Sequence, residues 1–266
     1  MEKVLQEHQI YHFGYVSFQH LNIFDVRSKA RIPENCTGAI AMVFPYYNKN
    51  AFGGNISAYC SVEDYHVVAM MQLKSMCSSL KDKYPDYNFV PFTDSSPINE
   101  VDMCVKAGLG VRGRNSLLIT PWYGSYVFIG EILTDMPLEN TTCYKNKGCL
   151  NCGLCEKACP GKAISQFGVN TEKCASHLTQ KKGELTEEET AIIEKAHTIF
   201  GCDICQLVCP MNKHVTEVPN LFSKNIMNTV TKENVAGIYK SRPFGWRGLK
   251  VLERNIEIYN KNSKSE

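Results

Sequence analysis

The spacing of the cysteines constrains this chain more than any other feature. The 266 residues include 13 cysteines, and eight of them fall in tight clusters between Cys143 and Cys209, with Cys174 between two of the clusters. A secreted domain held by disulfides would be shorter and would lack a large core. Closely spaced cysteines in a reducing compartment indicate metal ligation instead.

The first motif, CLNCGLCEKACPGKAI, matches the run of cysteines found in bacterial ferredoxins, in which the fourth cysteine binds the other cluster. Its members are Cys149, Cys152, Cys155 and Cys159, and Pro160 follows. We expect the first three to wrap one face of a cubane cluster. The fourth, Cys159, is expected to start a helix that points toward a neighbouring cluster.

The second motif contains Cys202, Cys205 and Cys209, again followed by proline. It lacks one cysteine of the ferredoxin pattern, and Cys174 is the natural replacement. The ligand count then closes at eight, which corresponds to two 4Fe–4S clusters. The predicted ligands are Cys149, Cys152, Cys155 and Cys209 for cluster 1, and Cys159, Cys174, Cys202 and Cys205 for cluster 2.

Zinc is the alternative occupant of such a region. Zinc ribbons use pairs of CxxC with four ligands per ion, and triplets followed by Cys-Pro fit that pattern poorly. Cys143 lies near the first motif, and we assign it no role. The other four cysteines are expected to be small buried hydrophobes: Cys36, Cys60, Cys77 and Cys104.

The remaining composition excludes several classes of protein. The net charge of +2 does not indicate binding to nucleic acid or to a membrane surface. No apolar run reaches the length of a transmembrane helix, and the N-terminus lacks the segments of a signal peptide. We therefore expect a cytoplasmic protein with no membrane partner.

Residues 1–140 show α/β patterning. Ala39–Phe44 and Tyr87–Phe92 are predicted strands. The segment 61–86 is a predicted helix with Ser61 and Asp64 as a capping box. Its apolar stripe consists of Tyr65, Ala69, Leu73, Met76 and Leu80.

Further along, residues 98–108 are a predicted helix closed by Gly108. The segments 116–120 and 125–133 are predicted to form a β-hairpin across PWYG. We expect three parts: residues 1–140 as the catalytic α/β domain, 141–215 as a small domain held by metal, and 216–266 as a segment that packs back on the core.

The cysteine-rich part contains one predicted helix, in GELTEEETAIIEKAHTIFG, with acidic residues in its first turn. At the other end of the last segment, NKNSKSE is expected to be a frayed polar tail.

Two short motifs resemble cofactor sites only in part. GLGVRG satisfies GxGxxG, but a helix precedes it and a strand follows, which inverts the dinucleotide-binding context. Its glycines could let the backbone approach a large flat ligand. Asp64 and His66 begin the DxHxxG pattern of some cobalamin proteins, but Ala69 replaces the glycine. We expect no histidine on a cobalt ion.

Several stretches together resemble the epoxyqueuosine reductase family. The longest is the segment 94–135, which includes PINEVDMCVKAGLGVRGRNSLLITPWYGSYVFIGEILTD. The others are FPYYN, SAYCSVEDYHVV, CASHLT, GCDICQLVCPMNK and FGWRGLKVLERN, and the set follows the family's order over roughly residues 36–256. The resemblance implies an α+β fold, in which an α/β core like that of reductive dehalogenases carries a bacterial ferredoxin-like double 4Fe–4S domain.

The resemblance also implies a reaction. Members of the family bind base-off cobalamin, pass single electrons through two 4Fe–4S clusters to form Co(I), and reduce epoxyqueuosine in tRNA to queuosine. The electrons come from an external donor, ferredoxin or flavodoxin. The family's proton donor lies in its D-S/T-x-P stretch, which here begins at Asp94.

The residue chemistry agrees with that role. An epoxide oxygen needs a proton to leave as water, and a carboxylic acid supplies it when a dry pocket or a nearby anion raises its pKa. Asp94 follows a predicted strand end, where such pockets form; its alternative role is to start a turn. The side chains expected near cobalamin are Tyr46, His66, Arg112, Asn115, Ser176 and Asp203.

The chain departs from the family in places. His177 stands where tyrosine is usual and Val111 where tryptophan is common, and the stretch after GYVSF is shorter. The chain also stops soon after Arg254. The stretch Lys240, Arg242, Arg247, Lys250 and Arg254 is either a phosphate-binding face or an ordinary solvated one.

These departures leave two alternatives to a tRNA enzyme. One is an electron-transfer protein or corrinoid reductase that acts on a corrinoid protein. The other is a dehalogenase-like reductase of small molecules.

Overall fold

The computed structural model describes residues 1–24, 26–141 and 148–262, which form two compact units. The first, called here the sheet unit, comprises Met1–Pro45, His66–Gly113 and Leu117–Cys149. The second, called the cysteine unit, comprises Tyr46–Tyr65, Arg114–Ser116 and Leu150–Glu266. The predicted division at residues 140 and 215 stays a prediction.

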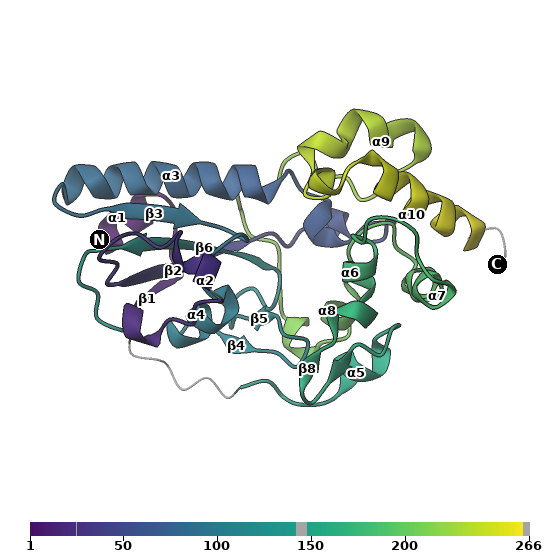
Figure 1. Cartoon of the computed structure of the whole chain (residues 1–266), viewed down its shortest axis with the longest axis horizontal. Helices are drawn as coiled ribbons and strands as arrows, with labels where there is room; N and C mark the ends of the chain where they lie inside the picture. Colours follow the sequence, from purple (N-terminus) through teal and green to yellow (C-terminus); the bar gives the residue numbers. More distant parts are fainter. Residues whose placement is uncertain (25, 142–147, 263–266) are drawn as a thin grey trace. The chain divides into compact units, whose positions relative to one another are not determined.

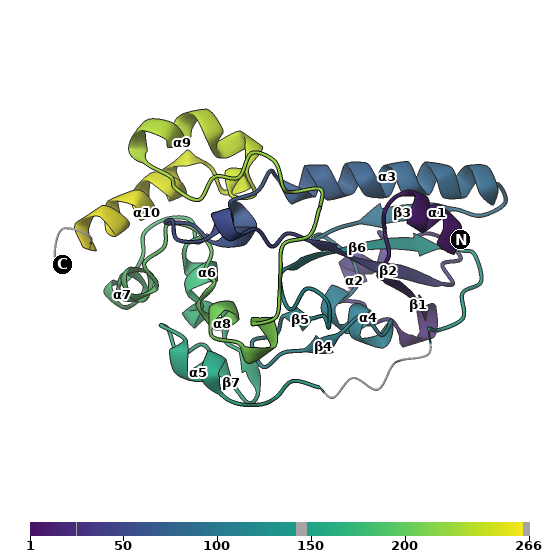
Figure 2. The same ribbon diagram turned by 180° about the vertical axis from the view of Figure 1, so that it is seen from behind.

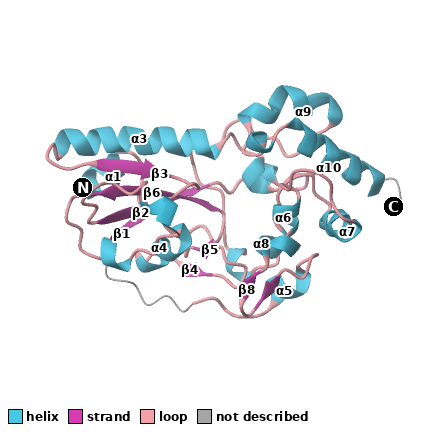
Figure 3. Ribbon diagram, viewed as in Figure 1, coloured by secondary structure: helices cyan, strands magenta, loops and turns pink. Residues whose placement is uncertain are grey.

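The sheet unit is built on four antiparallel strands in the order β1-β2-β6-β3 (Figures 1 and 3). Their bounds are β1 Phe13–Ser17, β2 Gly38–Pro45, β3 Phe89–Phe92 and β6 Val127–Thr134. The predicted strands at 39–44 and 87–92 are confirmed by β2 and β3. β2 and β6 are almost continuously buried, because each has a strand on both sides and is covered on its faces.

One face of the sheet is covered by α3 (Tyr65–Lys83), which runs along it in both views (Figures 1 and 2). The predicted stripe is largely confirmed, since Ala69, Leu73, Met76 and Leu80 are fully buried. Gly130 in β6 permits this close packing, because a Cβ there would stand 3.2 Å from Leu73 of α3 and 2.5 Å from the Phe44 ring. The short α1 (Glu2–Glu7) is tied to α3 through its C-terminal neighbour His8, whose Nε2 lies 3.0 Å from the Ser79 hydroxyl.

The predicted capping box of α3 is wrong. The helix begins at Tyr65, and the Ser61 hydroxyl instead shares its one proton between the carbonyl oxygens of Ala51 and Ser57. Ser61 follows the 3-10 turn Ala58–Cys60, and the Asp64 N–H donates to the Ser241 carbonyl oxygen at 3.2 Å, so neither residue closes the predicted box.

The other face of the sheet packs against α4 (Glu100–Lys106), as predicted for residues 98–108. Met103 and Cys104 of α4 join an apolar cluster with Ala41, Val43 and Leu133 of the sheet. Asn99 caps the helix by accepting a hydrogen bond from the Asp102 N–H. Gly108, at φ +77°, follows its end as expected.

The predicted hairpin over 116–133 is wrong. β5 (Leu118–Ile119) pairs with β4 (Val111–Arg112), while β6 pairs with β2 and β3. An isolated bridge, Thr120 to Gly124, spans the PWYG turn. The long-range partners of β6 were not visible in the local pattern. The unit also contains α2 (Val26–Lys29) and a 3-10 turn, Phe18–His20.

The cysteine unit consists mostly of short helices and loops (Figure 3). Its helices are α5 (Leu154–Ala158), α6 (Ala175–Leu178), α7 (Glu187–Ala196), α8 (Ile204–Leu207), α9 (Lys232–Ile238) and α10 (Leu249–Asn262). A small hairpin joins β7 (Ile164–Ser165) to β8 (Gly168–Val169). The 3-10 turns of the unit are Lys49–Ala51, Ala58–Cys60, Thr171–Lys173, Pro210–Asn212, Tyr239–Ser241 and Gly245–Arg247.

Two apolar clusters support this unit. The larger combines Ile56 and Cys60 with Phe200, Phe244 and Leu252. The smaller joins α6 and α7, through residues that include Leu178 and Ile193. Helix α10 packs on both α7 and α9. The apolar contacts of the unit thus come largely from its later helices, and Cys202 and Ile204 of the second cysteine motif pack against the smaller cluster.

The predicted helix α7 is confirmed, with a capping box between Thr186 and Glu189. The predicted tail is partly wrong, because α10 continues to Asn262. No helix among the residues with an assigned structure is long and apolar enough to cross a membrane.

Candidate functional site

The first cysteine motif folds as a tight loop followed by α5. Asn151 (φ +50°) and Gly153 (φ +72°) adopt left-handed conformations, which turn the chain between the cysteines. Cys155 lies within α5, and Cys152 is exposed. The expectation that Cys159 starts a helix is wrong: it caps the C-terminus of α5 in an extended conformation before Pro160. Cys143 lies outside the described residues.

The second motif surrounds α8, which packs against α5. Cys205 lies within α8, and Cys209 precedes a 3-10 turn that begins at Pro210. The packing of α5 against α8 therefore brings together cysteine segments that are about fifty residues apart in the sequence.

The surroundings of Cys202 and Cys205 support the predicted ligand set of cluster 2. Burial is the main cause that raises the pKa of both thiols to about 12; Cys159 and Cys174 contribute to the shift of Cys202, and Cys174 and Cys155 contribute to that of Cys205. Cys159 and Cys174, two of the predicted partners of Cys202, thus lie close to it. Thiolates buried in this way need a compensating positive charge, which ligated iron provides.

Hydrogen bonds are donated to several sulfur atoms in this region, among them one from the Ile204 backbone to Cys202. The Ala163 N–H donates to the Cys159 Sγ at 3.3 Å, and the Asn115 Nδ2 donates to the Cys205 Sγ at 3.6 Å. Such bonds tune the reduction potential of an iron–sulfur cluster. The sequence analysis assigned Asn115 to a cobalamin contact and did not foresee this bond.

Asp203 is buried and anchors the second motif. Its Oδ2 accepts the Ala58 N–H at 2.6 Å, and its Oδ1 accepts the Gln206 Nε2 at 3.4 Å. Burial raises the pKa of Asp203 to about 6. Tyr46, also buried, donates its hydroxyl to the Gln206 Oε1 at 3.5 Å. The predicted cofactor contacts Tyr46 and Asp203 are therefore joined through one glutamine.

Ser176, at the second position of α6, hydrogen-bonds the Tyr59 hydroxyl through its side chain. Its carbonyl oxygen accepts from the side chains of Thr179 and Gln180. In the same neighbourhood, His177 Nε2 lies 3.7 Å from the exposed Glu172 Oε1. Ser176 thus links α6 to the segment around Tyr59.

In the sheet unit, Asp94 comes two residues after β3, as predicted. Its Oδ2 lies 3.0 Å from the Nε2 of His66 in the first turn of α3. The sequence analysis named both residues but did not pair them. The Asp94 side chain is 58% exposed, so the dry environment expected for this carboxyl is not supplied by close neighbours.

Two further carboxyl groups of this region, Glu131 and Glu100, were missed by the sequence analysis. Glu131 is fully buried at the centre of β6, and its Oε1 accepts the Ser96 hydroxyl. Burial raises the pKa of Glu131 to about 7. A glutamate inside the apolar strand VFIGEIL was the signal that could have revealed it, because charged residues are seldom fully buried.

Arg112, on β4, is exposed and donates from Nη2 to the Asn99 Oδ1 at 3.0 Å. Gly110 lies against the neighbouring strand, since a Cβ there would stand 2.4 Å from the Ile119 carbonyl oxygen. The glycine at this position is therefore explained by strand packing, and Val111 lies within β4 itself. The context of GLGVRG, with α4 before it, is not that of a dinucleotide site.

The predicted basic stretch is partly structural. Arg242 is buried and donates to the carbonyl oxygens of Ser61 and Asn225. Arg254 donates to those of Lys181 and Gly183. The other members are Lys240 and Lys250, both exposed, and Arg247, whose guanidinium lies 3.6 Å from the centre of the Trp246 ring.

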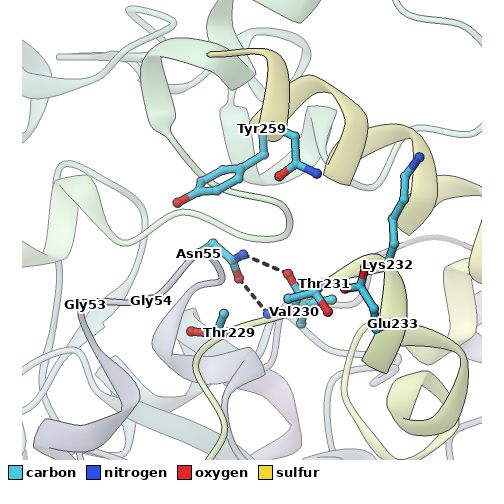
Figure 4. Close-up of a pocket in the computed structure, with 10 residues that line it drawn as sticks. Gly53, Gly54, Asn55, Thr229, Val230, Thr231, Lys232, Glu233 and Tyr259 are labelled. Carbon is cyan, nitrogen blue, oxygen red and sulfur yellow. Dashed lines mark hydrogen bonds between the residues drawn. The ribbon is translucent and has the colours of Figure 1, made fainter. Parts of the chain in front are cut away.

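A polar pocket of about 440 Å³ lies elsewhere in the cysteine unit (Figure 4). Asn55 lines it and makes two hydrogen bonds of 2.8 Å with the backbone of Val230: its Nδ2 donates to the carbonyl oxygen and its Oδ1 accepts the N–H. The other lining residues are Gly53, Gly54, Thr229, Thr231, Lys232, Glu233, Tyr259 and Asn260. None of the predicted site residues lines it.

Comparison with known proteins decides the family. The chain is 30% identical to the epoxyqueuosine reductase of Lactococcus garvieae over 270 residues, which cover 93% of this chain and 76% of that protein. It is 33% identical to that of Cyclobacterium marinum, over 89% of this chain and 81% of that protein. The chain belongs to the epoxyqueuosine reductase family. It is accordingly an oxidoreductase.

Residues 148–212 match the family model of the 4Fe-4S double cluster binding domain. The predicted presence of two 4Fe–4S clusters in this member of the epoxyqueuosine reductase family is confirmed, and zinc is not the occupant. The individual ligand assignments stay predictions.

Solved structures confirm the fold. An epoxyqueuosine reductase from Streptococcus thermophilus matches with a TM-score of 0.83 at 23% identity, over 98% of this chain and 80% of that one. A structure described as epoxyqueuosine reductase with an epoxyqueuosine-modified tRNA stem loop matches at 0.81 and 22% identity, over 99% and 81%. A B12-dependent reductive dehalogenase matches at 0.51 and 15%, over 96% and 34%. The predicted α+β class with a dehalogenase-like core is thereby confirmed.

Proposed function

We propose that this chain reduces epoxyqueuosine in tRNA to queuosine. The observation that carries the proposal is the presence, in one family member, of a double-cluster domain and of Asp94 paired with His66. A related structure contains a modified tRNA stem loop, which supports the substrate class. A tRNA substrate would place the reaction in the cytoplasm.

The reaction needs two electrons and two protons, because an epoxide becomes an alkene and a water molecule. In our proposal Asp94 donates one proton to the leaving oxygen, and solvent supplies the second. His66, whose Nε2 is 3.0 Å from Asp94 Oδ2, fixes one of the two carboxyl oxygens. The 58% exposure of the Asp94 side chain leaves the carboxyl accessible to a large substrate.

Electrons would come from an external ferredoxin or flavodoxin, one at a time, through the two clusters. We propose Cys149, Cys152, Cys155 and Cys209 as ligands of cluster 1, and Cys159, Cys174, Cys202 and Cys205 as ligands of cluster 2. The donor set suits iron, since thiolates are the usual ligands of 4Fe–4S clusters. The proximity of Cys159 and Cys174 to Cys202 supports the second set.

Base-off cobalamin, when bound, would supply the low-potential chemistry at the substrate carbon. Of the six residues predicted beside it, Asn115 and Asp203 direct polar atoms to Cys205 and Ala58. The others proposed to contact it are Tyr46, His66, Arg112 and Ser176. The Nε2 of His66 lies 3.0 Å from the Oδ2 of Asp94, and the absence of a histidine ligand on cobalt stays a prediction.

The decisive experiment uses the full chain with reconstituted clusters, cobalamin, a chemical reductant and tRNA that contains epoxyqueuosine. Wild type should form queuosine, and Asp94→Asn should lower single-turnover rates about 100-fold or more. Asp86→Asn, in an exposed turn, is the matched control and should behave as wild type. A loaded, reduced enzyme that forms no queuosine would exclude this substrate.

One observation favours a second candidate function, that of a corrinoid reductase acting on a partner protein. Two arginines of the basic stretch, Arg242 and Arg254, donate hydrogen bonds to internal carbonyl oxygens. Fewer exposed cations therefore remain to bind the phosphates of a tRNA. A corrinoid reductase acting on a partner protein would need no such surface. Tight binding of a corrinoid protein together with no binding of tRNA would favour that function.

A further inference from the structure

The backbone at Asp94 adopts a conformation that needs support. Its φ of +60° lies in the left-handed region, which residues with a Cβ seldom occupy. Such conformations persist where the surrounding structure holds them, and they are common at functional sites. The contacts that hold Asp94 therefore decide where its carboxyl group points.

Glu100 provides the contact at the strained residue itself. The Asp94 N–H donates a hydrogen bond of 2.9 Å to Glu100 Oε1. Glu100 is the first residue of α4, whose apolar side packs on the sheet. The acceptor is thus mounted on a rigid element, and it reaches back across the loop to the Asp94 backbone.

The remainder of the loop is anchored on β6 and on neighbouring backbone. Thr93 donates its hydroxyl to the Ile129 carbonyl oxygen at 2.8 Å, and Ser96 donates its hydroxyl to Glu131. The Ile98 N–H donates to the Ser96 Oγ at 2.9 Å. Asp94, between these anchors, depends on Glu100 for its backbone hydrogen bond.

The charge state of Glu100 is compatible with this role. Burial, and then the nearby Glu131 and Asp94, raise its pKa well above the ordinary range. A protonated carboxyl keeps a carbonyl oxygen that accepts the Asp94 N–H. Repulsion between Glu100 and Asp94 is then reduced, so the hydrogen bond is made without bringing two negative charges together.

We propose that Glu100 is a positioning residue that holds Asp94 in its left-handed conformation and so aims the Asp94 carboxyl group at His66 and the substrate. This inference rests on the proposed role of Asp94 as proton donor. Glu100 itself transfers no proton to the substrate. Its contribution is the acceptor oxygen, not its charge.

Three variants of the full chain distinguish the effect of the Glu100 acceptor oxygen from the effect of its charge. Glu100→Gln keeps an acceptor oxygen at the same reach, Glu100→Asp keeps the carboxyl but withdraws it by one methylene, and Glu100→Ala removes it. Asp102→Asn is the matched control, because it removes a first-turn carboxylate of α4 that pairs with Lys106 and Asn22 instead of Asp94.

The first measurement is hydrogen exchange at the Asp94 amide, which does not depend on cofactors or substrate. Exchange should quicken about tenfold or more in Glu100→Asp and Glu100→Ala, which is the scale of one lost hydrogen bond, and should stay near wild type in Glu100→Gln and Asp102→Asn. Single-turnover rates for queuosine formation should follow the same order. If Glu100→Ala fails to fold, the difference in Asp94 amide exchange between Glu100→Gln and Glu100→Asp still tests the positioning role.

Unchanged exchange at Asp94 in Glu100→Asp, or equal damage in Glu100→Gln and Glu100→Asp, would overturn the positioning role. Failure of the proposed function looks different: the loaded wild-type enzyme would form no queuosine, or Asp94→Asn would retain full activity, while the exchange pattern of the Glu100 variants would be unaffected.

Discussion

The two units build their candidate sites in opposite ways. In the sheet unit, Asp94 and His66 are held by a strand end and two helices, with Glu131 sealed in the central strand. In the cysteine unit, helices α5 and α8, which carry the proposed ligands Cys155 and Cys205, have only five and four residues, and both cysteines are half-buried. An apolar core positions the first site, whereas the second depends on the metal it binds.

The strongest test of this contrast removes one proposed cluster ligand. Cys202→Ser should lower the iron content from about eight to about four atoms per chain and should quicken hydrogen exchange around α5 and α8. Amides of β2 and β6 should keep their protection, because their core contains no metal. Iron analysis and exchange mass spectrometry measure both effects.

Cys77→Ser is the matched control for that experiment, since Cys77 is a half-buried thiol of α3 that takes no part in either predicted cluster. It should leave the iron content unchanged. If the Cys202 variant lost exchange protection equally in both units, the metal dependence would not be specific to the cysteine unit.

The backbone of the cysteine unit offers a second test. Gly201 (φ +73°) precedes Cys202, and a Cβ there would stand 1.9 Å from the Ser57 Oγ. Gly53 has a similar φ of +80° but open space around it. Gly53→Ala should lower the free energy of unfolding by about 1 kcal/mol through backbone strain alone.

Gly201→Ala should lower the free energy of unfolding by about 3 kcal/mol, because overpacking against Ser57 adds to the same backbone strain. Denaturant unfolding of the two variants, followed at the cysteine unit, makes the comparison. Equal losses would show that the loop before Cys202 is not closely packed.

The sheet unit should show a pH dependence caused by its buried carboxyl. Glu131 has a pKa of about 7 when folded and about 4.5 when unfolded, so the folded state keeps a proton that the unfolded state has lost. Its stabilising contribution is complete below about pH 4.5 and is lost as the pH rises through about 7, by about 3 kcal/mol in all.

Glu131→Gln should flatten this dependence. The difference in free energy of unfolding between pH 5 and pH 8 should be smaller in the variant than in wild type by up to about 3 kcal/mol. Urea unfolding at both pH values measures it. Parallel pH curves would mean that Glu131 is already ionised in the folded protein.

The smallest expected effect concerns a helix end remote from either site. Thr186→Ala removes the N-cap of α7, whose hydroxyl accepts the Glu189 N–H, and should cost about 1 kcal/mol. Thr190→Ala, the same change inside α7, should cost nothing, because alanine is the better helix former. A larger loss at Thr190 would indicate tertiary contacts there.

Elements with a strong local signal were predicted correctly. The apolar run of β2, the stripe of α3 and the capping box of α7 each depend on residues close together in the chain. The hairpin over 116–133 and the cap at Ser61 failed for a common reason. In both, a partner distant in sequence takes up backbone hydrogen bonds: β6 pairs with β2, and the Ser241 carbonyl oxygen accepts the Asp64 N–H.

The cysteine spacing by itself determined that the chain binds two clusters, because ligand number and the Cys-Pro signature are properties of the sequence. The sequence also marked Asp94 as a candidate acid. Only the tertiary structure decided that Asp94 is paired with His66 and held by Glu100, since these residues come from three elements that packing brings together. Local sequence patterns indicate helical periodicity and helix caps. The burial of Glu131 and the left-handed backbone of Asp94 depend instead on contacts made when the sheet and its helices pack together.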